Sequence, residues 1–109
     1  MRAGAAALFL LLAGCVAAPP QDRGSTLFLP DAGGLAVSGS ALRVDFGRAP
    51  DGVIAPLSRE LGPPRAVPLT GCPQGIERQL AWGDLVLTFT REQFVGWRQA
   101  GAAAGQICA

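Results

Sequence analysis

The feature that most constrains the fold is a pair of neighbouring apolar segments with a very short connection. Ile76–Trp82 and Leu85–Thr90 each have the length and composition of a β-strand, and only Gly83-Asp84 separates them. Glycine at the first position of such a connection favours the tight turns that join antiparallel strands, so we predict a β-hairpin. In this register one face carries Leu80, Trp82, Leu85, Leu87 and Phe89, and the other face carries Val86, Thr88 and Thr90.

Shorter segments before the hairpin predict additional strands. Thr26–Leu29 is an apolar run that we expect to stop at Pro30-Asp31, in a turn-forming stretch that extends to Gly34. Leu35–Val37 is expected to pair back on this run as a second short strand. Leu42–Phe46 alternates apolar and charged residues, which predicts a half-buried strand. Its inner face would consist of Leu42, Val44 and Phe46.

One helix is predicted between these strands and the hairpin. Its apolar residues Val53, Ile54, Leu57 and Leu61 fall on one helical face. Two starting points are compatible with the sequence. Either Asp51 caps a helix that begins at Gly52, or the helix begins at Pro56, because proline lacks the N–H that a helix interior needs. Gly62 and the prolines after it predict a sharp end, and residues 63–75 are expected to form a loop.

The residues after the hairpin complete the prediction of the fold class. Phe94–Trp97 is expected to form a further short strand, whereas Ala100–Gly105 contains only alanine and glycine. Together these elements predict an α+β fold, in which a small antiparallel sheet has one short helix packed on one face.

The N-terminal residues have the pattern of an export signal. Met1-Arg2 supplies a positive charge, and Ala5–Leu12 is an apolar run that is too short to span a membrane, which takes about 20 residues. The run leads into Leu12-Ala13-Gly14-Cys15, which resembles the lipobox of bacterial lipoproteins. The alternative is an ordinary secretory signal, since Val16-Ala17-Ala18 is close to the small-residue pattern of its cleavage site.

The resemblance to lipoproteins implies a location and a domain organisation. Residues 1–14 would be a signal peptide that is removed, and Cys15 would carry the lipid (a diacylglycerol, with palmitate). Residues 15–25 would be a flexible tether, and residues 26–109 a single periplasmic domain of the bacterial cell envelope. In the enterobacterial lipoproteins that this pattern resembles, Asp after the cysteine retains the protein in the inner membrane. Val16 therefore favours the outer membrane.

The cysteine count predicts one disulfide bond. The chain has 3 cysteines, so lipidation of Cys15 leaves Cys72 and Cys108. An exported protein meets an oxidising compartment, and a bridge across 36 positions would stabilise so small a domain by about 4 kcal/mol. The alternative is two free thiols, which could form an intermolecular bridge.

The composition excludes several classes of chemistry. The chain has no histidine and no lysine, and its formal net charge is +1. There is thus no histidine base or ligand, no lysine nucleophile and no polybasic segment that would bind nucleic acid or anionic lipid. We expect no catalytic residues, no cofactor and no metal site. Trp82 and Trp97 are expected in the core or at its edge, and the alternative is that they line an interaction surface.

Beyond the signal, the chain has the order of a strand, a helix that ends in Leu61-Gly62-Pro63, a hairpin with Trp82 and a closing Gly96-Trp97. This order resembles that of small Gram-negative envelope lipoproteins of the SmpA/OmlA type. Members of that family place helices against a three-stranded antiparallel sheet and assist outer-membrane protein assembly. This chain differs in having one short helix and an additional N-terminal β segment, and no functional residues are carried over.

These observations predict a non-catalytic, membrane-anchored envelope protein with a structural or protein-interaction role. Its partners would be the membrane, through the N-terminal lipid, and an envelope protein, but not nucleic acid. The alternative is a periplasmic inhibitor or small-ligand-binding lipoprotein, which a projecting loop around Cys72 would favour. A remote alternative is a hydrolase that uses two carboxylates, because the chain has 8 acidic residues.

Overall fold

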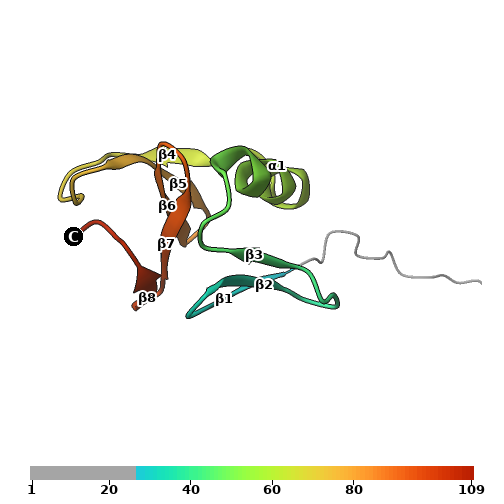
Figure 1. Ribbon diagram of the computed structural model, residues 1–109. Coiled ribbons are helices and arrows are strands. Elements are labelled where there is room, and N and C mark those ends of the chain that lie inside the picture. The colour runs from blue at the N-terminus through green and yellow to red at the C-terminus, as the bar shows by residue number, and fades with distance from the viewer. Residues whose placement is uncertain (1–26) are drawn as a thin grey trace, which may run out of the picture.

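The structure is a computed structural model that describes residues 27–109. The predicted signal peptide, Cys15 and the tether lie outside the described residues, as does Thr26. The described chain forms two antiparallel sheets and one α-helix, so the α+β class is confirmed at that level (Figure 1). The prediction of a single sheet is wrong, because the strands before the helix form a sheet of their own.

The first sheet has three strands in sequence order, β1 (Phe28–Asp31), β2 (Gly34–Val37) and β3 (Arg43–Asp45). The strand β1 continues through Pro30 and Asp31, where we expected it to stop. Proline is tolerated there because β1 is an edge strand, where a missing N–H need not interrupt a ladder. Leu42 precedes β3 and is 71% exposed, so it does not share the inner face of Val44 as predicted.

The helix α1 (Pro50–Leu61) begins earlier than either predicted start. Its N-cap is Ala49, which makes no side-chain cap hydrogen bond, and Asp51 lies in the first turn instead of capping it. Pro56 lies inside the helix and cannot donate to the carbonyl of Gly52, because proline has no N–H. The predicted end is confirmed, since Gly62 follows Leu61 with φ 91° and donates its N–H to Ser58.

The second sheet has five antiparallel strands in sequence order. They are β4 (Arg65–Val67), β5 (Ile76–Trp82), β6 (Leu85–Thr90), β7 (Phe94–Gln99) and β8 (Ala102–Gly105). The central hairpin β5–β6 is confirmed with its register, Trp82 opposite Leu85 and Leu80 opposite Leu87. The two edge strands β4 and β8 were not predicted, because one lies in the proline-rich segment and the other contains only alanine and glycine.

A single apolar core joins the two sheets and the helix. In Figure 1, α1 and the three-stranded sheet lie on the same side of the five-stranded sheet. The core consists of Leu35, Val44, Val53, Leu57, Leu80, Trp82, Leu85, Leu87, Phe89, Phe94 and Trp97. Backbone hydrogen bonds reinforce the junction, since Gly47 donates to Phe94 and Phe94 donates to Arg48. The two sheets and the helix therefore share one core.

The opposite face of the five-stranded sheet is also covered, which the sequence did not predict. Val86 and Thr88 lie on that face and are only 6% and 1% exposed. The C-terminal segment crosses this face at Gly96, which pairs with Thr88. A Cβ built on Gly96 would overlap the backbone of Gln106, so Gln106 lies directly against Gly96. Gln106 also donates its N–H to Val95. The residues after β8 thus act as a cover over this face.

Candidate functional site

The disulfide between Cys72 and Cys108 is present in the structure, with Cα atoms 4.0 Å apart. It joins the C-terminal segment to residues 68–75, which we call the stapled loop. Ala109 donates its N–H to the carbonyl of Gly71, and Gln79 donates its side-chain N–H to the carbonyl of Pro68. The predicted pairing thus fastens both the loop and the alanine- and glycine-rich segment that precedes Cys108.

The stapled loop extends beyond the other strands at one end of the five-stranded sheet (Figure 1). Two turns shape it, closed by hydrogen bonds from Cys72 to Leu69 and from Ile76 to Pro73. Gly71 and Gly75 have φ angles of 74° and 96°, which glycine adopts without strain. Leu69 is 44% exposed, so the loop presents an apolar side chain on a covalently fastened backbone.

Both tryptophans belong to the core, as the sequence favoured. Trp82 and Trp97 are 7% and 6% exposed, and each indole N–H is used internally. Trp82 donates to the carbonyl of Gly62 and Trp97 to that of Asp31, each at 2.8 Å. The alternative that these side chains line an interaction surface does not fit their burial, because a partner could reach neither ring without opening the core.

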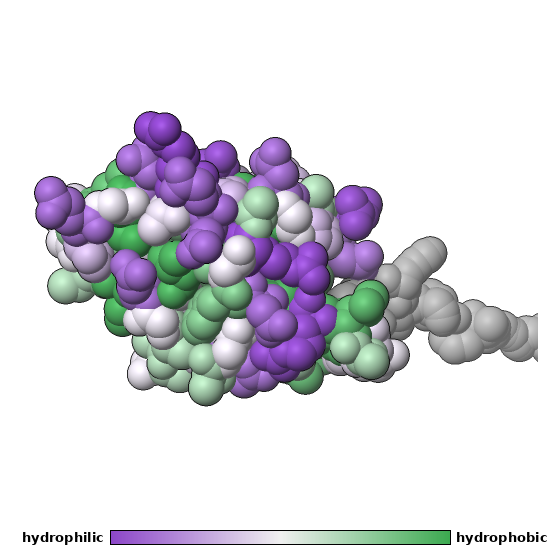
Figure 2. Space-filling model, viewed as in Figure 1, coloured by the Kyte–Doolittle hydropathy of each residue, from purple (hydrophilic) through white to green (hydrophobic). Residues whose placement is uncertain are grey.

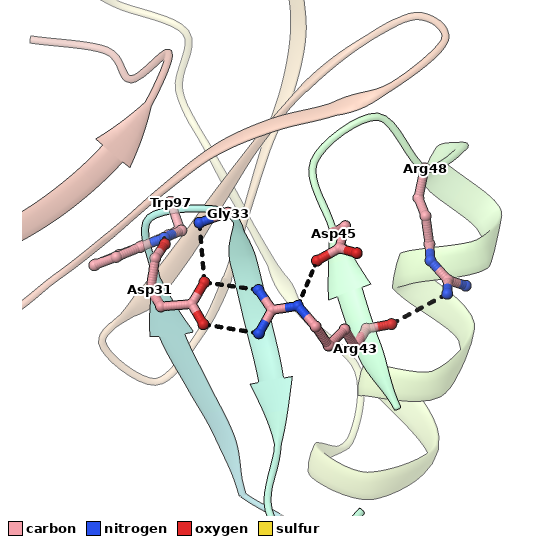
Figure 3. A network of polar contacts seen from close by, with 6 residues as sticks. All are labelled: Asp31, Gly33, Arg43, Asp45, Arg48 and Trp97. Atoms are coloured by element: carbon pink, nitrogen blue, oxygen red, sulfur yellow. Dashed lines mark hydrogen bonds and ion pairs between the residues drawn. The ribbon is translucent and has the colours of Figure 1, made fainter. Parts of the chain in front are cut away.

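A cluster of charged side chains joins the strands of the small sheet (Figure 3). Arg43 donates two hydrogen bonds to the carboxylate of Asp31, at 2.7 and 2.8 Å, and its Nε donates to Asp45 at 2.7 Å. The hydrogen bonds from Arg43, and then the one from the backbone N–H of Gly33, lower the pKa of Asp31 from 3.8 to about 2. Asp31 is therefore ionised at every physiological pH.

This cluster bears on the remote alternative of a two-carboxylate hydrolase. Asp31 and Asp45 are the two acids that the cluster brings together, but Arg43 lies between them and binds both. A general acid needs a pKa near the working pH, and that of Asp31 is displaced in the opposite direction. The arrangement suits a structural link between β1 and β3 better than proton transfer.

A groove of about 540 Å³ lies between the small sheet and α1. Its apolar lining comes from Phe28, Val37, Leu42, Val44 and Pro56, and its polar lining from Ser38, Ser40, Arg43, Arg48, Arg59 and Glu60. Gly52 also faces it, and a Cβ built there meets nothing within 4 Å. Asp31 and Asp45 neutralise Arg43, which leaves Arg48 and Arg59 against Glu60. This balance favours a ligand with negative charge, and the volume is within the range of small-molecule sites.

Sequence reasoning missed this groove, and no local signal could have found it. Arg43, Arg48 and Arg59 are spread over three elements of the chain, and the fold alone brings them to one surface. Among residues 27–109, neither Arg48 nor Arg59 forms an ion pair, whereas Arg43 pairs with Asp31 and Asp45. Arg48 donates one hydrogen bond, to the backbone carbonyl of Arg43 at 3.1 Å.

Within the described part of the chain, no group of three or more His, Cys, Asp or Glu side chains lies close enough to hold a metal ion. The helix in this part is not long and apolar enough to cross a membrane. The chain matches no known family model, no curated protein and no solved structure.

Proposed function

We propose that this chain is a non-catalytic, lipid-anchored protein of the bacterial envelope with a structural or protein-interaction role. The anchor is supported by the apolar run and by the pattern Leu12-Ala13-Gly14-Cys15. The chain has 3 cysteines, and Cys15 is the one that remains once Cys72 and Cys108 have paired. An exported lipoprotein with one disulfide is expected to have this cysteine count.

The stapled loop is the observation that carries the interaction role. A disulfide and two hydrogen bonds, those of Ala109 and Gln79, hold its backbone, so little conformational entropy is lost when a partner binds. It exposes Leu69, and in Figure 1 it lies at the end of the domain remote from the start of β1. A domain anchored through its N-terminus would present this loop away from the membrane.

Anchoring is tested first, on the full chain expressed in a Gram-negative host. We expect wild-type protein in the membrane fraction, with a mature N-terminus at Cys15 and the mass of an attached lipid. Cys15→Ser should leave an unlipidated precursor or release the protein from the membrane. A lipid-free N-terminus at Ala17 or later would overturn the lipoprotein assignment and support the ordinary secretory signal.

The interaction role is tested by placing a photoreactive amino acid at Leu69 in intact cells, with Ala55 on α1 as the control position. Both positions are exposed, but only Leu69 belongs to the stapled loop. We expect one envelope protein to be crosslinked from Leu69 and not from Ala55, and the purified partner to bind Leu69→Asp more weakly. Equal crosslinking from both positions would contradict a role for the loop.

The periplasmic inhibitor is a narrower form of the same proposal, and the projecting loop around Cys72 favours it. In that case the partner crosslinked at Leu69 is an enzyme, and adding the purified domain lowers its activity. A crosslinked partner without enzymatic activity would favour the structural role instead. Small-ligand binding is the second candidate function, and the groove between α1 and the small sheet is the specific observation that favours it.

A further inference from the structure

We infer that the groove end of the domain docks on the surface of an anionic phospholipid bilayer, with lipid phosphates at Arg48 and Arg59. We call this surface the Leu27 face and define it by Leu27, Leu42, Arg48 and Arg59. The inference rests on the proposed lipid anchor and assigns a ligand class to the groove. It was not expected from the sequence, which has no polybasic segment.

The strand register places two exposed leucines at the same end of the small sheet. Phe28 pairs with Val37 and Arg43 with Ala36, so Leu27 and Leu42 both lie beside the end of β2. Leu27 is 57% exposed and Leu42 is 71% exposed, more than any other large apolar side chain of the described residues. Successive residues of a strand alternate between its two faces, so Leu27 and Leu42 project from opposite faces and share only this end of the sheet. Exposed leucines at one end of a sheet indicate that this end contacts another phase or molecule.

The groove beside Leu42 carries two arginines that form no ion pair among residues 27–109. The backbone of Arg48 lies next to Asp45, and its side chain reaches back along β3 to the carbonyl of Arg43. Arg48 and Arg59 line the groove together with Leu42, and both are exposed. The acids that neutralise Arg43 lie at the other end of the small sheet, because Gly34 pairs with both Asp31 and Asp45. Glu60 is the acidic residue in the lining, so the groove itself has more positive than negative charge.

The path of the chain brings this face toward the membrane. The described chain begins at Leu27, and 12 positions separate it from Cys15. Twelve extended residues span at most about 43 Å, so a lipid on Cys15 keeps Leu27 within that distance of the bilayer. Such a short link gives a high effective concentration of lipid at the face, which makes a weak affinity sufficient.

The arginines and leucines of the Leu27 face suit the phosphate head groups and the acyl-chain boundary of a membrane surface, respectively. Guanidinium groups form paired hydrogen bonds with phosphate oxygens, and leucines enter the boundary between head groups and acyl chains. Figure 2 shows apolar surface beside strongly hydrophilic surface at the end of the domain that the small sheet forms, at the lower right of the view. Each basic side chain near an anionic bilayer adds about 1 kcal/mol of attraction, about fivefold in occupancy.

The test uses the lipidated protein in vesicles of phosphatidylcholine mixed with phosphatidylglycerol, and in vesicles of phosphatidylcholine alone. A photoreactive amino acid replaces Leu42 or, as the matched control, Leu69, and lipid adducts are measured by mass spectrometry. We expect phospholipid adducts from Leu42 in the mixed vesicles, and roughly tenfold fewer from Leu69. Equal yields from the two positions would overturn the inference.

Charge is tested in the Leu42 background. The pair Arg48→Gln and Arg59→Gln should lower the adduct yield in mixed vesicles about 25-fold, which is about fivefold for each lost charge. Arg78→Gln with Arg91→Gln removes two exposed arginines from other elements and should leave the yield unchanged. An unchanged adduct yield in the Arg48→Gln, Arg59→Gln variant would show that these arginines do not bind lipid, which contradicts the inference. Crosslinks between two copies of the protein would show that the Leu27 face self-associates, which also contradicts it.

Flotation of the same samples separates this inference from the anchoring proposal. Protein that floats with vesicles but gives no lipid adduct at Leu42 is anchored without docking, so the inference fails and the proposed anchor stands. Protein that carries no lipid and does not float overturns both.

Discussion

Trp97 on β7 donates its indole N–H to the backbone carbonyl of Asp31, 66 positions earlier at the end of β1. This hydrogen bond, 2.8 Å long, ties the five-stranded sheet to the small sheet at the edge of the shared core. The same Asp31 uses its side chain to bind Arg43, so one residue links β1 both to β3 and to β7. Asp31 is therefore one of the links that hold the small sheet in position, together with the shared core.

Replacing Trp97 with phenylalanine should loosen the small sheet. The aromatic ring is kept, but the carbonyl of Asp31 loses its donor, which costs about 1–3 kcal/mol of unfolding free energy. Amide exchange in β1 and β2 should accelerate more than exchange in β5 and β6. Trp82→Phe is the matched control, because its lost bond to Gly62 lies at the end of α1. Equal acceleration of β1 and β2 in both variants would contradict the proposed link.

Reducing the disulfide should destabilise the domain markedly. In the chain-entropy treatment a bridge between residues 36 positions apart contributes about 4 kcal/mol. Unreduced protein should show no thiol at Cys72 or Cys108, and reductant should lower its melting temperature. The double variant Cys72→Ala with Cys108→Ala should melt at the lower temperature with or without reductant. A melting temperature that reductant does not change would show that the bridge does not constrain the domain.

The ion pair of Asp31 predicts a specific response to acid. Its folded-state pKa, about 2, lies below the unfolded value of 3.8, so the unfolded chain binds this proton more readily. The stability that the pair contributes is complete above about pH 4 and is lost as the pH falls toward 2. Asp31→Asn should remove this part of the acid response in thermal melts between pH 2 and 5. An identical pH profile in wild type and variant would contradict it.

Two glycine substitutions should have opposite signs. Gly96→Ala places a methyl group on the backbone of Gln106, so the C-terminal cover must move and the domain should lose stability. Gly52→Ala places the same group in open space within α1, where alanine is favoured by about 0.5–1 kcal/mol. Chemical denaturation of both variants measures the difference. A stabilised Gly96→Ala would show that the cover is not packed as described.

The parts of the fold that could be predicted are those whose signal is local. The hairpin Ile76–Thr90 was predicted with its register because the pattern of apolar residues and a glycine in the turn act over a few positions. The helix end at Gly62 was predicted for the same reason. The start at Pro50 was not, because Ala49 provides no capping side chain to recognise.

The remaining elements lack a pattern of apolar residues or depend on contacts between distant residues. β8 contains no residue that favours a strand strongly; it pairs with β7 through the short turn Ala100-Gly101, and the disulfide fastens the C-terminal residues beyond it. The groove has the same origin, since Arg43, Arg48 and Arg59 have no common sequence pattern. The cysteine pair is an intermediate case, because the count predicted a bridge but not that the C-terminal segment it fastens would cover the second face of the sheet.

The bridge between Cys72 and Cys108 also closes a covalent ring that contains β5, β6, β7 and β8. A protease that cuts one peptide bond within this ring produces two pieces that remain joined through sulfur. A nicked molecule would therefore migrate with intact protein under non-reducing conditions and separate only after reduction. In an oxidising compartment the ring keeps these four strands together after a cleavage that would release part of a linear chain.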